Sequence, residues 1–270
     1  MQAKKADRPA GEEQRLDSGA AGELSLETRL RIAALPLALL LALWFHATAL
    51  GHFLQRTFLT MMVHEGGHAA TAWLCGYGAF PFLWRTWIAE SRGPLTMLLV
   101  FAAGAGLLAI GLRSGWRLGA CAGAVLLVLQ LWGTAILRPL SAQALITFGG
   151  DGGALVFGTL LMMSFFFGRG TQLYRGGLRW GFLVIGAAAF VDTFATWWQA
   201  RRDPDVIPFG EIEGVGLSDP SKLTDVYGWP THLMINRYVG LGVACLLALA
   251  CVWVWGIRAA RNAGESDFVE

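Results

Sequence analysis

The stretch MMVHEGGHAATAWL, residues 61–74, places two histidines and a glutamate inside a segment that is otherwise apolar or small, about 58–76. His64 and His68 are four residues apart, so on a helix both imidazoles lie on one face and can bind one metal ion. Glu65 follows the first histidine, where a general base would take a proton from a metal-bound water. Ionisable residues inside a membrane helix mark function. The stretch predicts a metal site within a membrane, with a chance HExxH match as the alternative.

The composition of the chain is that of a polytopic membrane protein. Of its 270 residues, 55% are hydrophobic, only 15% are charged and 12 are tryptophans. A soluble domain is less apolar than this. The net charge of +2 gives no indication of a nucleic-acid partner. The cysteines form no CxxC pair and are interpreted as small buried hydrophobes, not as a disulfide framework or a thiolate zinc site: Cys75, Cys121, Cys245 and Cys251.

Apolar runs long enough to cross a bilayer recur along the chain. They predict an all-α fold of about seven transmembrane helices, at about 32–50, 58–76, 94–112, 116–137, 153–167, 178–198 and 238–257. The segment GYGAFPFLWRTWIAESRGP, residues 76–94, is aromatic, punctuated by glycine and too short for a full span. It is typical of a short hairpin after the second span, with its tryptophans at headgroup level.

Polar segments set the domain boundaries. Residues 1–28 lack an apolar helical stripe and predict a disordered tail, while 261–270 form a C-terminal tail. The transmembrane domain between them, 29–260, contains a polar surface loop at 199–237 that could serve as a lid. Lysines and arginines near the N-terminus favour a cytoplasmic N-terminus. We expect an integral, multi-pass protein of a bacterial-type plasma membrane.

A catalytic zinc needs three protein ligands and an open position for water, so the histidine pair needs a third partner. Asp151 lies in FGGDGG, where glycines let the backbone bend and approach closely, although capping the next helix is an equal alternative. Asp192 could be a ligand, a partner of a ligating histidine, or a residue facing a polar cavity. His232 near a membrane boundary is more typical of a structural histidine.

The expected depth of each residue favours Asp151. With seven spans and an inside N-terminus, His46 and His52 lie toward the outer end of the first span. His68 would lie in the inner half of the second span, and Asp151 would lie near the inner start of the fifth. We therefore expect the ligands to meet in the inner half of the membrane, without His46 or His52.

The residues HEGGH, together with the later Asp151-Gly152-Gly153, resemble motifs of the site-2 proteases, the membrane-embedded zinc metalloproteases of peptidase family M50. The resemblance implies that His64, His68 and Asp151 bind Zn²⁺ and that Glu65 is the catalytic base. It also implies that the aromatic segment after the histidines forms the β-hairpin of that family. The motifs cover about a tenth of the chain, and the remainder matches only by hydropathy.

We therefore expect an intramembrane zinc endopeptidase that hydrolyses peptide bonds of membrane-bound protein substrates. A substrate helix would have to unwind locally, because its peptide bonds are hidden in hydrogen bonds. Two alternatives are a membrane transporter, whose polar residues line a pathway, and a zinc-binding scaffold without catalysis. Only Asp192 is clearly mid-span outside the motifs, which gives the transporter few pathway residues. The expected partners are the lipid bilayer and a membrane-protein substrate.

Overall fold

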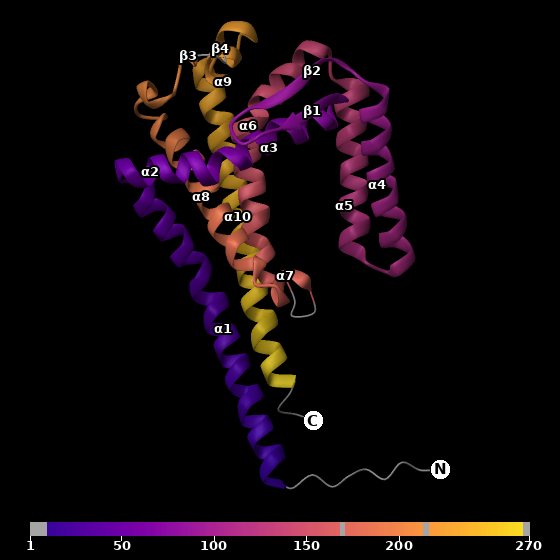
Figure 1. The fold of residues 1–270 in the computed structure, drawn as a ribbon, viewed down its shortest axis with the longest axis vertical. Coiled ribbons are helices and arrows are strands. Elements are labelled where there is room, and N and C mark those ends of the chain that lie inside the picture. The colour runs from indigo at the N-terminus through magenta and orange to yellow at the C-terminus, as the bar shows by residue number, and fades with distance from the viewer. Residues whose placement is uncertain (1–9, 168–170, 213–215, 267–270) are drawn as a thin grey trace.

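The computed structural model describes residues 10–167, 171–212 and 216–266, most of them in long helices (Figure 1). Within these residues, six helices are long and apolar enough to cross a membrane. They are α1 (Ala10–His46), α4 (Pro94–Ser114), α5 (Arg117–Leu131, extended by a π-helical turn at Trp132–Ile136), α6 (Pro139–Met163), α8 (Leu178–Gln199) and α10 (Thr231–Ser266). The predicted all-α, multi-pass membrane fold is confirmed.

The histidine-bearing run is not one of these six helices, so the described part of the chain has one span fewer than the seven expected. A π-helical turn, Arg56–Thr60, separates α2 (Ala49–Gln55) from α3 (Met61–Leu74). In Figure 1 this segment runs across the upper part of α6 and α8 instead of alongside them. The 14 residues of α3 reach about 21 Å, less than the roughly 30 Å of a hydrocarbon core. Its polar side chains are buried against protein, as irregular intramembrane segments require.

The loss of one crossing changes where the site lies. Figure 1 shows α6 starting at the end of the bundle opposite the N-terminus and running back toward it. We expected Asp151 near the start of the fifth span, at the end of the bundle that carries the N-terminus, but the structure places it near the middle of α6. With α3 crossing the bundle, the histidines meet the first half of α6 toward the opposite end. The direction of α6 follows from the number of preceding spans, which hydropathy overcounted by one.

Glycines allow α3 and α6 to pack with their backbones in contact. A Cβ added at Gly67 would overlap the carbonyl oxygen of Gly149 and lie 2.8 Å from the Cα of Gly153. Small residues permit such close helix crossings in membranes. The GGDGG sequence therefore serves helix packing as well as any role of Asp151 itself.

The hairpin predicted after the histidine segment is confirmed. Strands β1 (Tyr77–Pro81) and β2 (Thr86–Arg92) pair antiparallel, with Pro81 opposite Thr86. Arg92, at the end of β2, satisfies backbone carbonyls of the π-helical turn after α5, those of Gly133, Thr134 and Leu137. These bonds fix the hairpin between α3 and α5. The hairpin thereby holds Thr86 beside the histidine helix.

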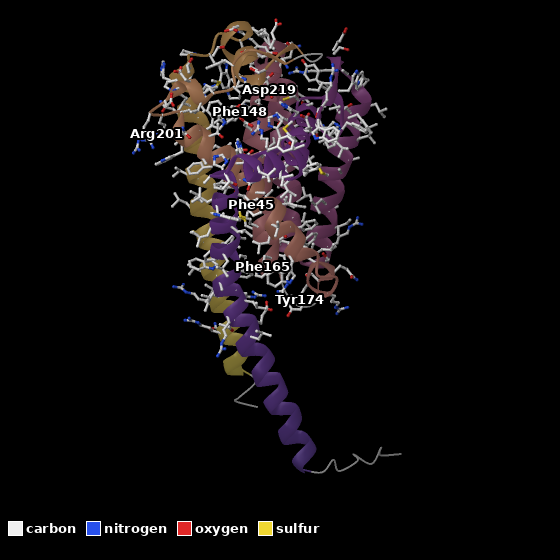
Figure 2. The ribbon with its side chains drawn as sticks, turned by 60° about the vertical axis from the view of Figure 1, so that its left-hand side comes forward. Phe45, Phe148, Phe165, Tyr174, Arg201 and Asp219 are labelled. Atoms are coloured by element: carbon white, nitrogen blue, oxygen red, sulfur yellow. The ribbon has the colours of Figure 1, made fainter. Side chains whose placement is uncertain are left out.

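The connection between α8 and α10 contains only short elements, in line with the expected surface loop. They are a 3-10 turn at Pro204–Val206, β3 (Glu211–Ile212), β4 (Gly216–Leu217), α9 (Asp219–Ser221) and a π-helical turn at Lys222–Val226. In Figure 1 they gather at the upper end of the bundle. Figure 2 shows Asp219 near Phe148 at this end, with Phe165 and Tyr174 toward the other. The connection thus covers the region where α3 crosses α6.

The terminal segments contain more helix than expected. Helix α1 begins at Ala10, so the predicted disorder of 1–28 differs from the structure over 10–28, and residues 1–9 lie outside the described residues. Segment 10–28 contains three Ala, four Glu and three Leu, which favour helix, and it continues a spanning helix, which removes the cost of nucleation. At the other end, α10 extends to Ser266, into the predicted tail, and 267–270 lie outside the described residues.

Candidate metal centre

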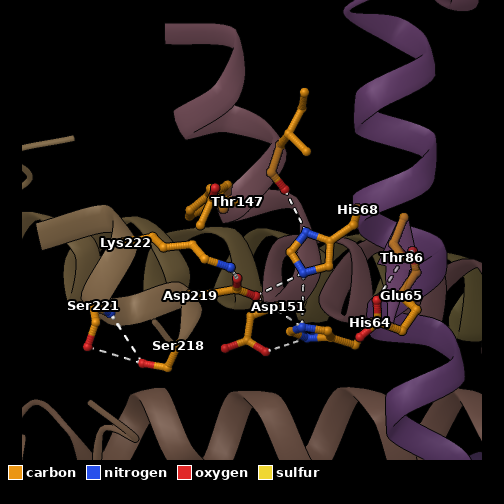
Figure 3. Close-up of polar contacts among 12 residues, drawn as sticks. His64, Glu65, His68, Thr86, Thr147, Asp151, Ser218, Asp219, Ser221 and Lys222 are labelled. Atoms are coloured by element: carbon orange, nitrogen blue, oxygen red, sulfur yellow. Dashed lines mark hydrogen bonds and ion pairs between the residues drawn. The ribbon is translucent and has the colours of Figure 1, made fainter. Parts of the chain in front are cut away.

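The two motif histidines lie side by side on the buried face of α3 (Figure 3). Their rings are nearly perpendicular, at 85°, with centroids 4.7 Å apart. The Nε2 atoms of His64 and His68 are 3.1 Å apart. Both side chains are at least nine-tenths buried, at 9% and 10% exposed. The spacing of four residues therefore brings one nitrogen of each ring to a common point.

The other ring nitrogen of each histidine has an acceptor as partner. Nδ1 of His68 is 2.8 Å from the carbonyl oxygen of Ile146, and Nδ1 of His64 is 2.9 Å from Oδ1 of Asp151. A carbonyl or carboxylate oxygen only accepts, so both Nδ1 atoms donate. In a neutral imidazole the second nitrogen then carries a lone pair. When both imidazoles are neutral, the two Nε2 atoms that meet are both acceptors, and a proton on either ring makes its Nε2 a donor.

A third acceptor reaches the same point from the connection between α8 and α10. Oδ2 of Asp219 lies 3.2 Å from Nε2 of His64 and 2.9 Å from Nε2 of His68. The three ligand-capable atoms all lie within 4.8 Å of one another. Lone pairs that converge in a buried place repel unless a proton or a metal ion lies between them. The residues present therefore fit a metal ion.

The electrostatics of the centre favour a cation as well. Burial by itself would raise the pKa of Asp219, but hydrogen bonds from His64 and His68 hold it well below its usual value. Burial would lower the pKa of His64, but its bonds to Asp151 and Asp219 raise it to about 10. Two carboxylates thus attract positive charge to one imidazole pair. A proton satisfies this attraction in part, and a divalent cation satisfies it more fully.

Asp151 approaches His64 from the side opposite to the convergent nitrogens. Its Oδ1 accepts from Nδ1 of His64, and its Oδ2 accepts from Nε1 of Trp197, 2.8 Å away. The structure thus brings Asp151 to the histidines, as expected, but on the ring atom that faces away from Asp219. Carboxylates in this position fix the tautomer and orientation of a metal-binding histidine. A Cβ at neighbouring Gly150 would lie 2.5 Å from Nε2 of His68, so only glycine fits behind the rings.

Asp219 is the residue that sequence reasoning missed. It lies 151 residues beyond His68 in a polar connection with several other acidic residues, and nothing in its local sequence marks a ligand. The side chain of Ser218 caps this segment by accepting from the amide of Ser221. The hydroxyl of Ser221 in turn accepts from the amide of Gly210, at 2.8 Å. These bonds hold Asp219 above the histidines, with Lys222 3.6 Å from its Oδ1.

Glu65 is buried beside the histidines, and its carboxylate is hydrogen-bonded to the hairpin. Oε2 of Glu65 accepts from the hydroxyl of Thr86 on β2 at 2.7 Å. In Figure 3, Glu65 and Thr86 lie to one side of His64 and Asp219 lies to the other. The hairpin therefore holds the carboxylate that the motif predicts as the base.

The other acids and histidines considered as ligands lie elsewhere. Asp192 is fully buried on α8 and bonds to His46, His52 and Arg56. His232 is exposed at the start of α10. The structure therefore separates Asp192 from the motif histidines. It instead places Asp192 beside His46 and His52, which lie outside the HEGGH motif.

An apolar cavity of about 930 Å³ lies on another side of the α3–α6 contact. Its walls come mostly from α3, α4, α5 and α6, with residues of β1 and α10 completing them, and Gly67, Gly149 and Gly153 line it. None of the four residues around the convergent atoms lines it: His64, His68, Asp151 and Asp219. This cavity is therefore separate from the candidate metal centre.

Comparison of the chain with protein-family models, with curated proteins and with solved structures gave no match in any of the three. The resemblance to site-2 proteases stays a prediction, based on HEGGH and on Asp151-Gly152-Gly153. What the centre can do chemically follows from its own geometry.

Proposed function

We propose that the protein is an intramembrane zinc endopeptidase, similar to the site-2 proteases, that hydrolyses peptide bonds of membrane-bound proteins. The observation that carries this proposal is the convergence of three acceptor atoms: Nε2 of His64, Nε2 of His68 and Oδ2 of Asp219. Beside them, on the same helix, stands a glutamate. Two histidines and a carboxylate, with one position left open, are the ligand pattern of catalytic zinc.

In this proposal Asp219 is the third ligand, and Asp151 orients His64. Zinc bonds of about 2.0–2.1 Å to nitrogen and oxygen at tetrahedral angles put ligand atoms roughly 3.4 Å apart. The observed separations of 3.1, 3.2 and 2.9 Å are close to that value. This assignment differs from the one implied by the family resemblance, in which Asp151 binds the metal. The ligand set itself, nitrogen and oxygen without sulfur, suits zinc.

Glu65 supplies the proton transfer in this proposal. A zinc ion at the centre would act as a Lewis acid and lower the pKa of water to around 7. Glu65 accepts the proton of the attacking water and delivers it to the departing amine. Thr86, which donates to the Glu65 carboxylate at 2.7 Å, orients it.

The membrane setting indicates the class of substrate. The centre is buried within a bundle of spanning helices, beneath the connection that carries Asp219. A peptide bond that reaches it must come from a chain in or at the membrane, in extended form, because a helix hides its peptide groups. Access requires the connection around Asp219 to move. We expect cleavage sites near Gly, Pro, Ser or Asn, which weaken a substrate helix.

A second function is metal binding without hydrolysis. The hydrogen bond between Glu65 and Thr86 favours it, because the carboxylate of the only glutamate of the motif is bonded to the hairpin. In that case the centre would stabilise the crossing of α3 and α6 under the connection. Zinc content does not distinguish the two functions, whereas cleavage does.

Zinc content of purified full-length variants tests the metal site. We expect about one zinc ion at the centre, lost in His68→Ala and Asp219→Ala, because each change removes one of three ligands. Asp151→Asn leaves His64 and Asp219 as ligands, so we expect it to weaken affinity by about 10–100-fold without abolishing binding. Metal analysis by mass spectrometry at controlled concentrations of free zinc measures the zinc content and affinity of each variant.

The result that would restore Asp151 as the ligand is the reverse pattern. In that case Asp151→Asn would lose its zinc completely, and Asp219→Ala would keep it at wild-type affinity. If both His68→Ala and Asp219→Ala kept the zinc ion of this centre, the proposed metal site would be contradicted. Asp225→Ala, which removes another acidic residue of the same connection, is the matched control and should bind like the wild type.

Zinc affinity should depend on pH. His64 in the metal-free centre has a pKa of about 10, so at neutral pH it holds a proton that zinc must displace. Apparent affinity should therefore rise about tenfold per unit of pH from about 7 to 9, as expected for release of one proton. Titration calorimetry in buffers of different ionisation enthalpy counts the proton. An affinity that does not change over this range would contradict the charge arrangement.

A further inference from the structure

A second group of two histidines and an aspartate lies where α1, α2 and α8 meet. Nδ1 of His46 is 3.3 Å from Oδ1 of Asp192, and Nε2 of His52 is 2.9 Å from the same oxygen. His46 ends α1 and His52 lies in α2. Asp192, in α8, is completely buried. Three helices thus direct one ligand-capable group each to a single place.

We propose that His46, His52 and Asp192 form a second zinc site. Their ligand-capable atoms lie within 4.8 Å of one another, as in the first centre. The imidazoles are arranged like those of His64 and His68, with centroids 4.6 Å apart and an interplanar angle of 66°. Imidazole nitrogen and carboxylate oxygen are ordinary zinc ligands, and three of them leave one position for water.

The local sequence creates this arrangement. The side chain of Thr48 caps α2 by accepting from the amide of Gly51, so the chain turns between α1 and α2. This turn brings the rings of two histidines six residues apart in sequence together edge to face, which a continuous helix would not do. The His52 side chain is 45% exposed, so the site opens to the surface of the protein.

Arg56 fixes the carboxylate from its other side. Its Nη1 donates to Oδ2 of Asp192 at 3.1 Å, which leaves Oδ1 for the two imidazoles. A hydrogen bond to the second carboxylate oxygen is a common outer partner of a metal ligand. The guanidinium charge also opposes a divalent cation. We therefore expect this site to bind zinc more weakly than the first centre.

The bound ion would fasten the α1–α2 corner to α8. The same three residues also form a hydrogen-bonded group without metal, in which both imidazoles donate to Asp192 and Arg56 balances its charge. The two possibilities differ in zinc content. The second site does not depend on peptidase activity, and its test separates it from the first centre.

The experiment counts zinc in the purified full chain across a series of free zinc concentrations. We expect about two ions in the wild type, about one in His52→Ala, about one in His68→Ala and none in the double variant. As the free zinc concentration is lowered, the wild type should first release the ion that His52→Ala lacks. His232→Ala removes an exposed histidine outside both groups and should bind as the wild type does.

His68→Ala keeps the proposal testable if His52→Ala fails to fold, because the second site is intact there. One zinc ion remaining in His68→Ala, with its melting temperature lowered by a chelator, would support the second site. No zinc in His68→Ala, or the same zinc content in His52→Ala as in the wild type, would overturn it. The first centre would stand in either case.

Discussion

Replacing Glu65 by glutamine is expected to lower the rate of peptide-bond hydrolysis by about 10²–10⁴-fold, the usual contribution of a general base. Glutamine has the same shape and can keep the hydrogen bond from Thr86, which the glutamate accepts at 2.7 Å. It cannot accept a proton. Because Glu65 contributes none of the three convergent ligand atoms, the zinc content of Glu65→Gln should stay at the wild-type level.

The measurement pairs cleavage with metal content. Transmembrane segments that carry Gly or Pro near their middle are reconstituted with the purified chain, and fragments are identified by mass spectrometry. Glu90→Gln, at an exposed position on β2, is the matched control and should cleave as the wild type does. If the wild type holds zinc and cuts no segment, or if Glu65→Gln cuts as well as the wild type, the enzymatic proposal fails and metal binding without hydrolysis remains.

Replacing Gly67 by alanine is expected to destabilise the protein by about 3 kcal/mol or more, at the upper end of overpacking costs. The added methyl would overlap the carbonyl oxygen of Gly149 and press on the Cα of Gly153. Both neighbours are backbone atoms of α6, so no side-chain rotation relieves the overlap. The two helices must separate, and His64 and His68 then move away from Asp151. Zinc affinity should fall together with the melting temperature.

Gly66 provides the matched control one residue earlier. A Cβ there meets nothing within 4 Å. Alanine is about 1 kcal/mol more favourable than glycine inside a helix, so Gly66→Ala should be neutral or slightly stabilising. Thermal unfolding in detergent and zinc content compare the two variants. Equal shifts in Gly66→Ala and Gly67→Ala would contradict the close backbone contact between α3 and α6.

Local patterns predicted the features that depend only on neighbouring residues. The four-residue spacing of His64 and His68 predicted that both rings would share one face, and they do. The glycine-rich aromatic segment predicted the hairpin, and β1 and β2 form it. Six of the seven runs predicted from hydropathy correspond to spanning helices, although the fifth, expected at 153–167, begins at Pro139 as α6. Hydropathy failed for 58–76 because an apolar run can equally be buried by protein, and α3 is buried in this way across α6.

The position of each carboxylate could not be read from neighbouring residues. Asp151 was expected among the ligands because it lies in a glycine-rich motif, and the structure places it on Nδ1 of His64. Asp219 lies in a polar connection and resembles its solvated neighbours in sequence. Asp192 and its two histidines converge only through a turn between α1 and α2 and the packing of α8. Each of these contacts joins segments far apart along the chain.

The sequence by itself determined that this is a helical, multi-pass membrane protein with an imidazole pair and a glutamate on one helix. Periodicity and hydropathy depend on residues that are close in sequence, so a short window of the sequence is enough to recognise them. Only the tertiary structure decided which carboxylate meets Nε2 of the histidines, which one supports Nδ1, and which end of the bundle holds them. Those outcomes depend on the direction in which α3 crosses α6 and on how the connection after α8 folds back. Both are set by packing between elements that are distant in sequence.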